Sequence, residues 1–270
     1  MRLFMTSPET GGRRFRIDLA YDGRPYAGWQ SQVGGNTIQD VLLGELQGVC
    51  AEIRTVQGSG RTDAGVSALR QVAHFDAPLT WRMNGGEWQR ALNSKLPAAI
   101  RVMRCGEIEP EFHARFSALE KEYRYDIATD DVLDPLLSGL AWHRRGLSSG
   151  LDLGEVLSIY EGRHDFRSFS AKRHDGKDEE RDTQRTLTLS SVEKLDAGVL
   201  QLRFRGNGFL YKMVRFLVGS AIYCVEGKIS PDEMKVLLQG CDLEKKAPFC
   251  APPDGLSLER VFYPPEFESF

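Results

Sequence analysis

The sequence predicts an α+β fold built from two halves. Strand, helix and strand patterns occur in both halves of the chain, and several neighbouring strands follow one another so closely that they must pair antiparallel. A doubly wound parallel fold would instead alternate strands with helices throughout. The length of 270 residues exceeds the usual size of a single domain, so we expect one large domain or two closely packed ones.

Strands are predicted where apolar residues alternate with polar ones or follow a turn. They lie at residues 15–21, 55–57, 71–75, from 100 onwards, 116–128, 186–192 and 199–204. The last two are separated by the turn Asp196-Ala197-Gly198, which is typical of a hairpin.

Helices are predicted where apolar residues recur three and four positions apart. They lie at residues 38–52, 87–92, 151–160, 208–225 and 231–238. Thr37 with Asp40 resembles an N-cap pair at the start of the first helix. Ser230 with Glu233 forms a capping box, and Pro231 occupies the first position of the last helix.

Turn-forming residues cluster between about residue 129 and residue 150, which predicts a domain boundary there. We therefore expect an N-terminal half at 13–135 and a C-terminal half at 136–270. Residues 1–12 contain no apolar core followed by a small-residue cleavage site, so they are interpreted as a flexible leader and not as a secretory signal.

Charge and cysteine content narrow the class of protein. A net charge of −3 and a pI near 6.0 exclude a uniformly basic nucleic-acid coat but permit a local basic cleft. The five cysteines are odd in number and widely spaced, which favours a reducing compartment, the cytoplasm, over a disulfide framework. Because Lys212 and Arg215 interrupt the longest apolar stretch, no membrane span is expected.

The five histidines never fall into the tight spacing of metal ligands, so no metal site is predicted. The sequence also contains no nucleophile elbow and no complete dinucleotide fingerprint. A serine hydrolase or a nicotinamide enzyme is therefore unsupported.

The loop at residues 58–66, Gly-Ser-Gly-Arg-Thr-Asp-Ala-Gly-Val, is the most unusual stretch. Its three glycines allow positive φ and a close approach to a ligand, while Arg61 and Asp63 lie two residues apart. The loop could hold a carboxylate beside a guanidinium, or it could be a tight turn with a local ion pair. A phosphate-binding loop fits less well, because no Gly-Lys-Ser/Thr follows and Asp63 would repel the anion.

Two further features suggest a site, and each has a structural alternative. Arg215 lies within an apolar helix, where an unpaired charge would be costly. Its partner could be Asp63 or another acid, or its side chain could extend to the surface. Tyr123 and Tyr125 share one face of a strand, either as core packing or as a platform on which bases stack.

The order of several motifs resembles the TruA-type tRNA pseudouridine synthases, over nearly the whole chain from about residue 15 to residue 263. The motifs are Tyr21-Asp22-Gly23, Gly28-Trp29-Gln30 with Gln32, Thr37-Ile38-Gln39, residues 60–66, residues 112–118 leading to Tyr123, Gly162-Arg163-His164-Asp165-Phe166 with Ser168-Phe169, residues 208–211 with Met213-Val214-Arg215, and Ala251-Pro252-Pro253 with Gly255-Leu256. Their combined coverage makes coincidence very improbable.

This resemblance implies an isomerase that converts uridine to pseudouridine in the anticodon arm of tRNA, at positions 38, 39 and 40, with no cofactor because the reaction is redox-neutral. Asp63 matches the family's catalytic carboxylate, as a nucleophile or as the group that assists glycal formation. Tyr123 would stack on the flipped uracil or serve in proton transfer, Arg61 would help to open the stem or occupy the vacated space, and Arg215 would support the carboxylate.

The resemblance also implies two ferredoxin-like halves, with mixed and mainly antiparallel sheets joined across a central active-site cleft. It implies a homodimer whose shared basic cleft holds tRNA, which would explain RNA binding by a chain with a net charge of −3.

Three positions depart from the usual family pattern. Ser67 replaces a histidine, Phe216 an asparagine and Ala99 an aspartate. Ser67 and Phe216 flank the site elements and motivate an alternative, a catalytically inactive RNA-binding protein or tRNA chaperone. A synthase of the same chemistry that acts on other uridines is a third hypothesis.

Overall fold

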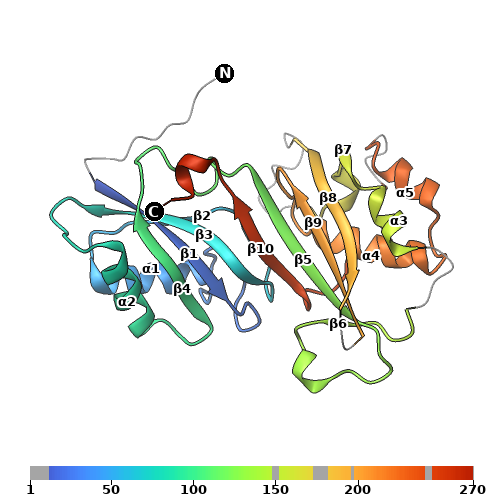
Figure 1. Ribbon diagram of the computed structural model, residues 1–270, viewed down its shortest axis with the longest axis horizontal. Coiled ribbons are helices and arrows are strands. Elements are labelled where there is room, and N and C mark those ends of the chain that lie inside the picture. Colours follow the sequence, from blue (N-terminus) through green and yellow to red (C-terminus); the bar gives the residue numbers. More distant parts are fainter. Residues whose placement is uncertain (1–11, 148–151, 173–181, 196–197, 241–244, 270) are drawn as a thin grey trace. The chain divides into compact units, whose positions relative to one another are not determined.

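The computed structural model describes residues 12–147, 152–172, 182–195, 198–240 and 245–269. The chain forms two compact units (Figure 1). The first unit comprises Met1–Leu119 and Leu258–Phe270, and the second comprises Glu120–Ser257. Within the described residues, no helix is both long and apolar enough to cross a membrane.

These bounds differ from the predicted halves at 13–135 and 136–270 because the end of the chain returns to the first unit. The rings of Tyr263 and Phe267 lie 5.1 and 5.3 Å from that of Phe112, and Arg16 Nη1 donates to the Phe267 carbonyl at 2.6 Å. A single cut at the turn formers of residues 129–150 cannot describe such a path. Of the predicted leader, Gly12 begins the first strand, and the other residues lie outside the described part.

The first unit contains a sheet with two helices. Its elements are β1 (Gly12–Tyr21), α1 (Ile38–Val49), β2 (Val56–Gly58), β3 (Ser67–Pro78), α2 (Gly85–Lys95) and β4 (Ile100–Glu107). The strands are ordered β4-β1-β3, β2 also pairs with β3, and β10 (Leu256–Phe262) lies beside β3. Because β1 pairs antiparallel with both β3 and β4, this arrangement has the predicted ferredoxin-like order.

Aromatic packing between sheet and helix holds the first unit together. Phe15 of β1 and Phe75 of β3 face each other in the register, and Trp88 of α2 contacts both rings, at centroid distances of 6.0 and 5.1 Å. Leu42 and Leu46 of α1, four positions apart on one helical face, are completely buried.

The second unit repeats the pattern of strands and helices. Its elements are β5 (Glu120–Ala128), β6 (Trp142–His143), α3 (Leu153–Ser158), β7 (Gly162–Asp165), β8 (Gln184–Lys194), β9 (Val199–Gly206), α4 (Met213–Val225) and α5 (Pro231–Leu237). The strands are ordered β5-β9-β8-β7, and these pairs are antiparallel where their register is defined, whereas β6 pairs parallel with β5. The α+β class with mixed, mainly antiparallel sheets is confirmed.

The apolar helix α4 forms the core of the second unit. Leu217 is completely buried, and its carbonyl accepts a hydrogen bond of 2.9 Å from the hydroxyl of Tyr160, which is also buried. A Cβ at Gly219 would lie 2.2 Å from the carbonyl oxygen of Phe249, so only glycine permits this approach of the helix to the segment before Ala251.

Several predicted boundaries shift for identifiable reasons. The helix predicted at 208–225 begins at Met213, because Lys212 has a left-handed φ of 59° that interrupts a right-handed helix. The strand predicted at 116–128 begins at Glu120, since Phe116 belongs to a turn. Both predicted caps are confirmed, at Thr37 and at Ser230. In the predicted turn 196–198, residues 196–197 lie outside the described part.

Candidate active site

The loop that carries Arg61 and Asp63 connects β2 to β3 in the first unit and packs on the segment around Gly28. Trp29 N donates to the Thr62 carbonyl at 3.1 Å. Gly28 has a φ of 92°, and a Cβ there would lie 2.7 Å from the same carbonyl oxygen and 3.1 Å from the carbonyl carbon of Asp63. The main chain on both sides of Asp63 is therefore held at a distance that only glycine allows.

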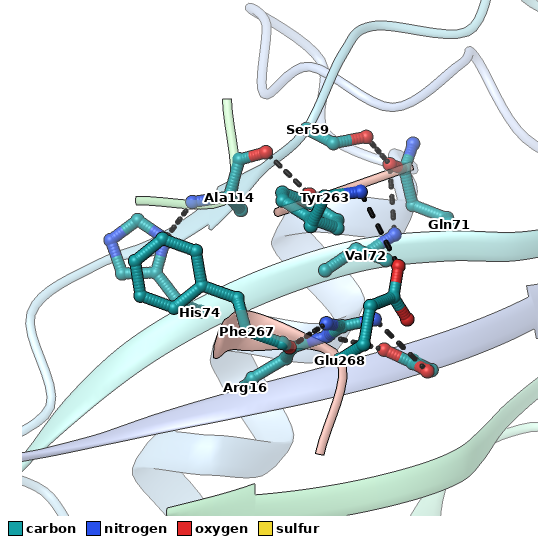
Figure 2. A network of polar contacts seen from close by, with 10 residues as sticks. Arg16, Ser59, Gln71, Val72, His74, Ala114, Tyr263, Phe267 and Glu268 are labelled. Carbon is teal, nitrogen blue, oxygen red and sulfur yellow. Dashed lines mark hydrogen bonds and ion pairs between the residues drawn. The ribbon is translucent and has the colours of Figure 1, made fainter. Parts of the chain in front are cut away.

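A completely buried glutamine anchors the start of the loop (Figure 2). Gln71 Oε1 accepts hydrogen bonds from Ser59 Oγ at 2.7 Å and from Val72 N at 3.2 Å. Its Nε2 donates to the Gly60 carbonyl at 3.1 Å and to the Tyr21 hydroxyl at 3.4 Å. One amide side chain thus satisfies groups of two strands and of the loop at once.

The same network reaches the residue directly before Asp63. The hydroxyl of Tyr21 lies 2.8 Å from Thr62 Oγ1, and both side chains are buried. Burial raises the pKa of Tyr21 to about 12, against the smaller opposing effect of its hydrogen bonds to Thr62 and Gln71. The phenol is therefore neutral at physiological pH, and its proton can serve the bond to Thr62.

Arg61 and Asp63 differ in exposure: Asp63 is half-buried and Arg61 is exposed. Arg61 Nε donates to Gln30 Oε1 at 3.1 Å, and Gln30 Nε2 donates to Gln39 Oε1 at 2.7 Å. Gln39 in turn donates to the carbonyl of Val56 at 2.9 Å. The side-chain amides of Gln30 and Gln39 therefore link the guanidinium of Arg61 to α1 and β2 and orient it.

In the second unit, Tyr123 lies on β5 and is 7% exposed. Its ring meets that of Phe209 edge to face, with centroids 4.9 Å apart. Tyr125 is completely buried on the same strand, and its hydroxyl donates to the Pro252 carbonyl at 2.9 Å. The core-packing interpretation therefore describes Tyr125, while Tyr123 keeps a small exposed edge.

Arg215 lies in the first turn of α4 and is half-buried. Its Nε donates to the Ala251 carbonyl at 2.7 Å, and the amide of Ala251 donates back to the Arg215 carbonyl at 3.0 Å. A main-chain carbonyl thus accepts from one of the guanidinium donors and fixes the direction of the side chain.

The described residues contain no group of three or more histidine, cysteine, aspartate or glutamate side chains arranged to hold a metal ion. The first unit thus offers a carboxylate on a loop with a fixed main chain and an exposed guanidinium, and the second unit offers a guanidinium and a phenol.

Comparison with known proteins decides the family. A family model described as tRNA pseudouridine synthase matches residues 156–264. The chain is 46% identical to the tRNA pseudouridine synthase A of Akkermansia muciniphila, over 94% of this chain and 96% of the relative. The corresponding proteins of Chromobacterium violaceum and Geobacillus kaustophilus are 39% and 40% identical, over 94% of this chain and 94% and 96% of their own length. This chain belongs to the tRNA pseudouridine synthase A family.

The residues that family resemblance singles out are divided between the units. Arg61 and Asp63 share the loop of the first unit, and Tyr123 and Arg215 belong to β5 and α4 of the second. Ser67, one of the departures from the family pattern, has a structural role, since its Oγ accepts a hydrogen bond of 3.0 Å from Gly23 N.

Sequence reasoning did not single out Gln71, and it assigned no role in holding the loop to Ser59 or Tyr21, although both lie in motifs that it named. A polar residue at a strand position, immediately before the apolar run Val72-Ala73, was the available signal for Gln71. The role of Gly28 was contained in the motif Gly28-Trp29-Gln30, but its close approach to the loop depends on tertiary structure.

Proposed function

We propose that this chain isomerises uridine to pseudouridine in the anticodon arm of tRNA, at positions 38, 39 and 40, with Asp63 as the catalytic carboxylate. The relatives that cover almost the whole chain carry the name of this activity, which supports tRNA as the substrate and isomerisation as the reaction. The observation that carries the assignment of Asp63 is the loop itself, whose main chain is fixed on both sides of the carboxylate.

The reaction breaks the N1–C1′ bond of uridine and joins C5 of the same uracil to C1′. The proton lost from C5 is balanced by one gained at N1, so product and substrate are isomers and no oxidant or reductant takes part. Asp63 acts either by adding to the sugar or base or by assisting glycal formation. In both routes a main chain fixed on both sides of the carboxylate lowers the entropic cost of reaching the transition state.

The other three residues act on the flipped nucleotide. A base in a stem hides its reacting atoms, so it must leave the stack at a cost of a few kcal/mol. Arg61, exposed and oriented by Gln30, would occupy the vacated space. Tyr123 would stack on the uracil, and Arg215, directed by the Ala251 carbonyl, would support the carboxylate and the substrate phosphate.

The test is site-resolved detection of pseudouridine by carbodiimide-dependent stops of reverse transcription on unmodified tRNA. We expect stops in the anticodon arm with the wild-type protein and with Glu107→Gln, a control carboxylate that pairs with Arg13. Asp63→Ala should give none. Stops at other uridines would contradict the substrate position, and tRNA binding without any stops would favour the inactive RNA-binding protein.

We further infer a homodimer in the cytoplasm. The location is supported by a tRNA substrate and by Cys50, Cys105 and Cys224, none of which forms a disulfide. Analytical ultracentrifugation tests the dimer: sedimentation as a species of twice 30.3 kDa is the expected result, and a monomer at all concentrations would contradict it.

A further inference from the structure

One aromatic side chain of the first unit lies mostly in solvent. Phe116 is 67% exposed, and every other aromatic residue that the structure describes is buried or half-buried. It belongs to the turn of residues 112–117, here called the Phe116 turn, which follows β4. A large exposed apolar ring contributes little to folding, so its position calls for another explanation.

Two hydrogen bonds at Ala114 hold the Phe116 turn in place (Figure 2). The Ala114 amide donates to His74 Nδ1 of β3 at 3.2 Å, and its carbonyl accepts from the hydroxyl of Tyr263 at 2.5 Å. Ala114 and the neighbouring Phe112 are completely buried. The turn is thus fixed to the sheet and to the end of the chain.

His113 fixes the ring of Phe116 itself. Its Nδ1 accepts hydrogen bonds from the amides of Arg115 and Phe116 at 3.1 and 3.3 Å, and its Nε2 lies 2.9 Å from Gln57 Oε1. The two rings lie 4.3 Å apart with an interplanar angle of 35°. The imidazole therefore supports Phe116 from one side and leaves much of the ring in solvent.

One arginine lies beside this ring, and a second lies on the strand that bonds the residue Leu119 after the turn. The guanidinium carbon of Arg115 lies 5.6 Å from the centroid of Phe116. Three residues after Phe116, Leu119 N donates to the carbonyl of Phe262 in β10 at 2.9 Å, and the guanidinium carbon of the exposed Arg260 lies 4.8 Å from the centroid of the Phe262 ring. Exposed arginines interleaved with aromatic rings are typical of surfaces that bind single-stranded nucleic acid.

We propose that the Phe116 turn is an RNA-binding subsite, where an unpaired base of the substrate stacks on Phe116 and the adjoining phosphates pair with Arg115 and Arg260. This proposal rests on the proposed function, because it takes tRNA as the ligand. A ring held rigidly before binding loses little conformational entropy when a base stacks on it. Stacking tolerates any base, so the subsite would increase affinity without selecting sequence.

Equilibrium binding of unmodified tRNA tests the stacking contact. Phe116→Ala should weaken binding about tenfold, within the range for loss of one base–aromatic contact, and Phe116→Trp should restore it. Leu79→Ala is the matched control, because Leu79 is 65% exposed in the same unit but lies at the end of β3. This control should bind tRNA as the wild type does, and all three variants should keep the thermal midpoint.

The salt dependence of binding tests the arginines. Arg115→Gln should reduce the slope of log Kd against log salt concentration by about one, which corresponds to the loss of one phosphate contact. An unchanged slope together with an unchanged affinity of Phe116→Ala would overturn the subsite. A change of oligomeric state with unchanged RNA affinity would also overturn it, since the turn would then contact a second copy of the chain.

The two proposals fail in different ways. If the wild-type protein binds and isomerises tRNA while Phe116→Ala behaves identically, the subsite alone is wrong. If the wild-type protein binds no tRNA, the proposed function is wrong and the subsite with it.

Discussion

The two regions that carry the candidate site residues are stabilised by different interactions. In the first unit, the loop of Asp63 is held by a buried amide, three hydroxyl groups and a glycine that approaches its main chain. In the second unit, Arg215 is carried by an apolar helix and tied to Ala251 by a reciprocal pair of bonds.

Because of this difference, each region should be destabilised by a different kind of substitution. A buried polar network is sensitive to the loss of a single donor or acceptor, because its partners remain buried and unsatisfied. An apolar helix is sensitive to lost volume, because a cavity remains where the side chain packed. The following predictions test this contrast.

The largest expected effect is in the apolar region. Leu217→Ala removes a completely buried side chain and should lower the free energy of unfolding by about 2–5 kcal/mol, as measured by urea denaturation. Val236→Ala in α5, where the side chain is 46% exposed, should change stability by less than about 0.5 kcal/mol. Equal effects of the two substitutions would contradict the role of α4 as a core.

Gly28→Ala tests the close approach to the loop. The new Cβ would meet the Thr62 carbonyl at 2.7 Å in a backbone with a φ of 92°, which should cost about 2–4 kcal/mol and lower kcat. Gly34 has a comparable φ of 104° but no atom within 4 Å. Gly34→Ala should therefore cost only the conformational strain, about 1–2 kcal/mol, and leave kcat unchanged.

Low pH should lower the stability of the first unit, because His74 is buried in its neutral form. Burial lowers the pKa of His74 to about 3, with smaller contributions from His113 and Arg14, so the imidazole stays neutral in the folded state, whereas in the unfolded state it gains a proton below its ordinary pKa of 6.5. Its contribution to stability is therefore complete above that value and decreases as the pH falls toward 3.

Between about pH 7.5 and pH 4.5, the wild type should lose about 2–3 kcal/mol more than His74→Asn, whose Oδ1 can still accept from Ala114 N. Urea denaturation at both pH values measures the difference. Identical pH dependence of the two proteins would contradict the neutral, buried state of this imidazole.

Gln71→Met tests the buried amide with nearly the same side-chain shape. Ser59 Oγ and the Gly60 carbonyl then lose their hydrogen-bond partner, which should lower the free energy of unfolding by about 1–3 kcal/mol. We also expect a lower kcat with little change in KM, because the loop shifts while the surface that binds tRNA is unchanged. Gln201→Met is the control: Gln201 is 5% exposed and bonds Asp126 in the second unit. If Gln201→Met lowered kcat as much as Gln71→Met does, the result would contradict a specific role of Gln71 in positioning the loop.

Local signals predicted which segments form helices and strands better than where each begins, except where a capping residue marks the start. The caps at Thr37 and Ser230 depend on residues three positions apart, so the sequence located them correctly. The start of α4 could not be predicted, because the left-handed φ of Lys212 has no signal in a non-glycine residue. The contacts of Tyr263 and Phe267 with partners about 150 residues earlier in the chain have no signal in a local pattern.

The same limit applies to the candidate site. The residue types at Asp63, Arg61, Tyr123 and Arg215 indicated chemistry because their motifs are recognisable. The residues that fix their geometry, such as Gln71 and Gln30, act through tertiary contacts that no local pattern encodes.

The most direct test of the central claim is single-turnover isomerisation of tRNA by Asp63→Asn, with tRNA affinity and unfolding free energy measured on the same sample. Asparagine keeps the shape of the side chain but removes its charge and its nucleophilic oxygen. We predict no detectable pseudouridine, with affinity and stability unchanged. Pseudouridine formation at the wild-type rate would contradict the assignment of Asp63 as the catalytic carboxylate.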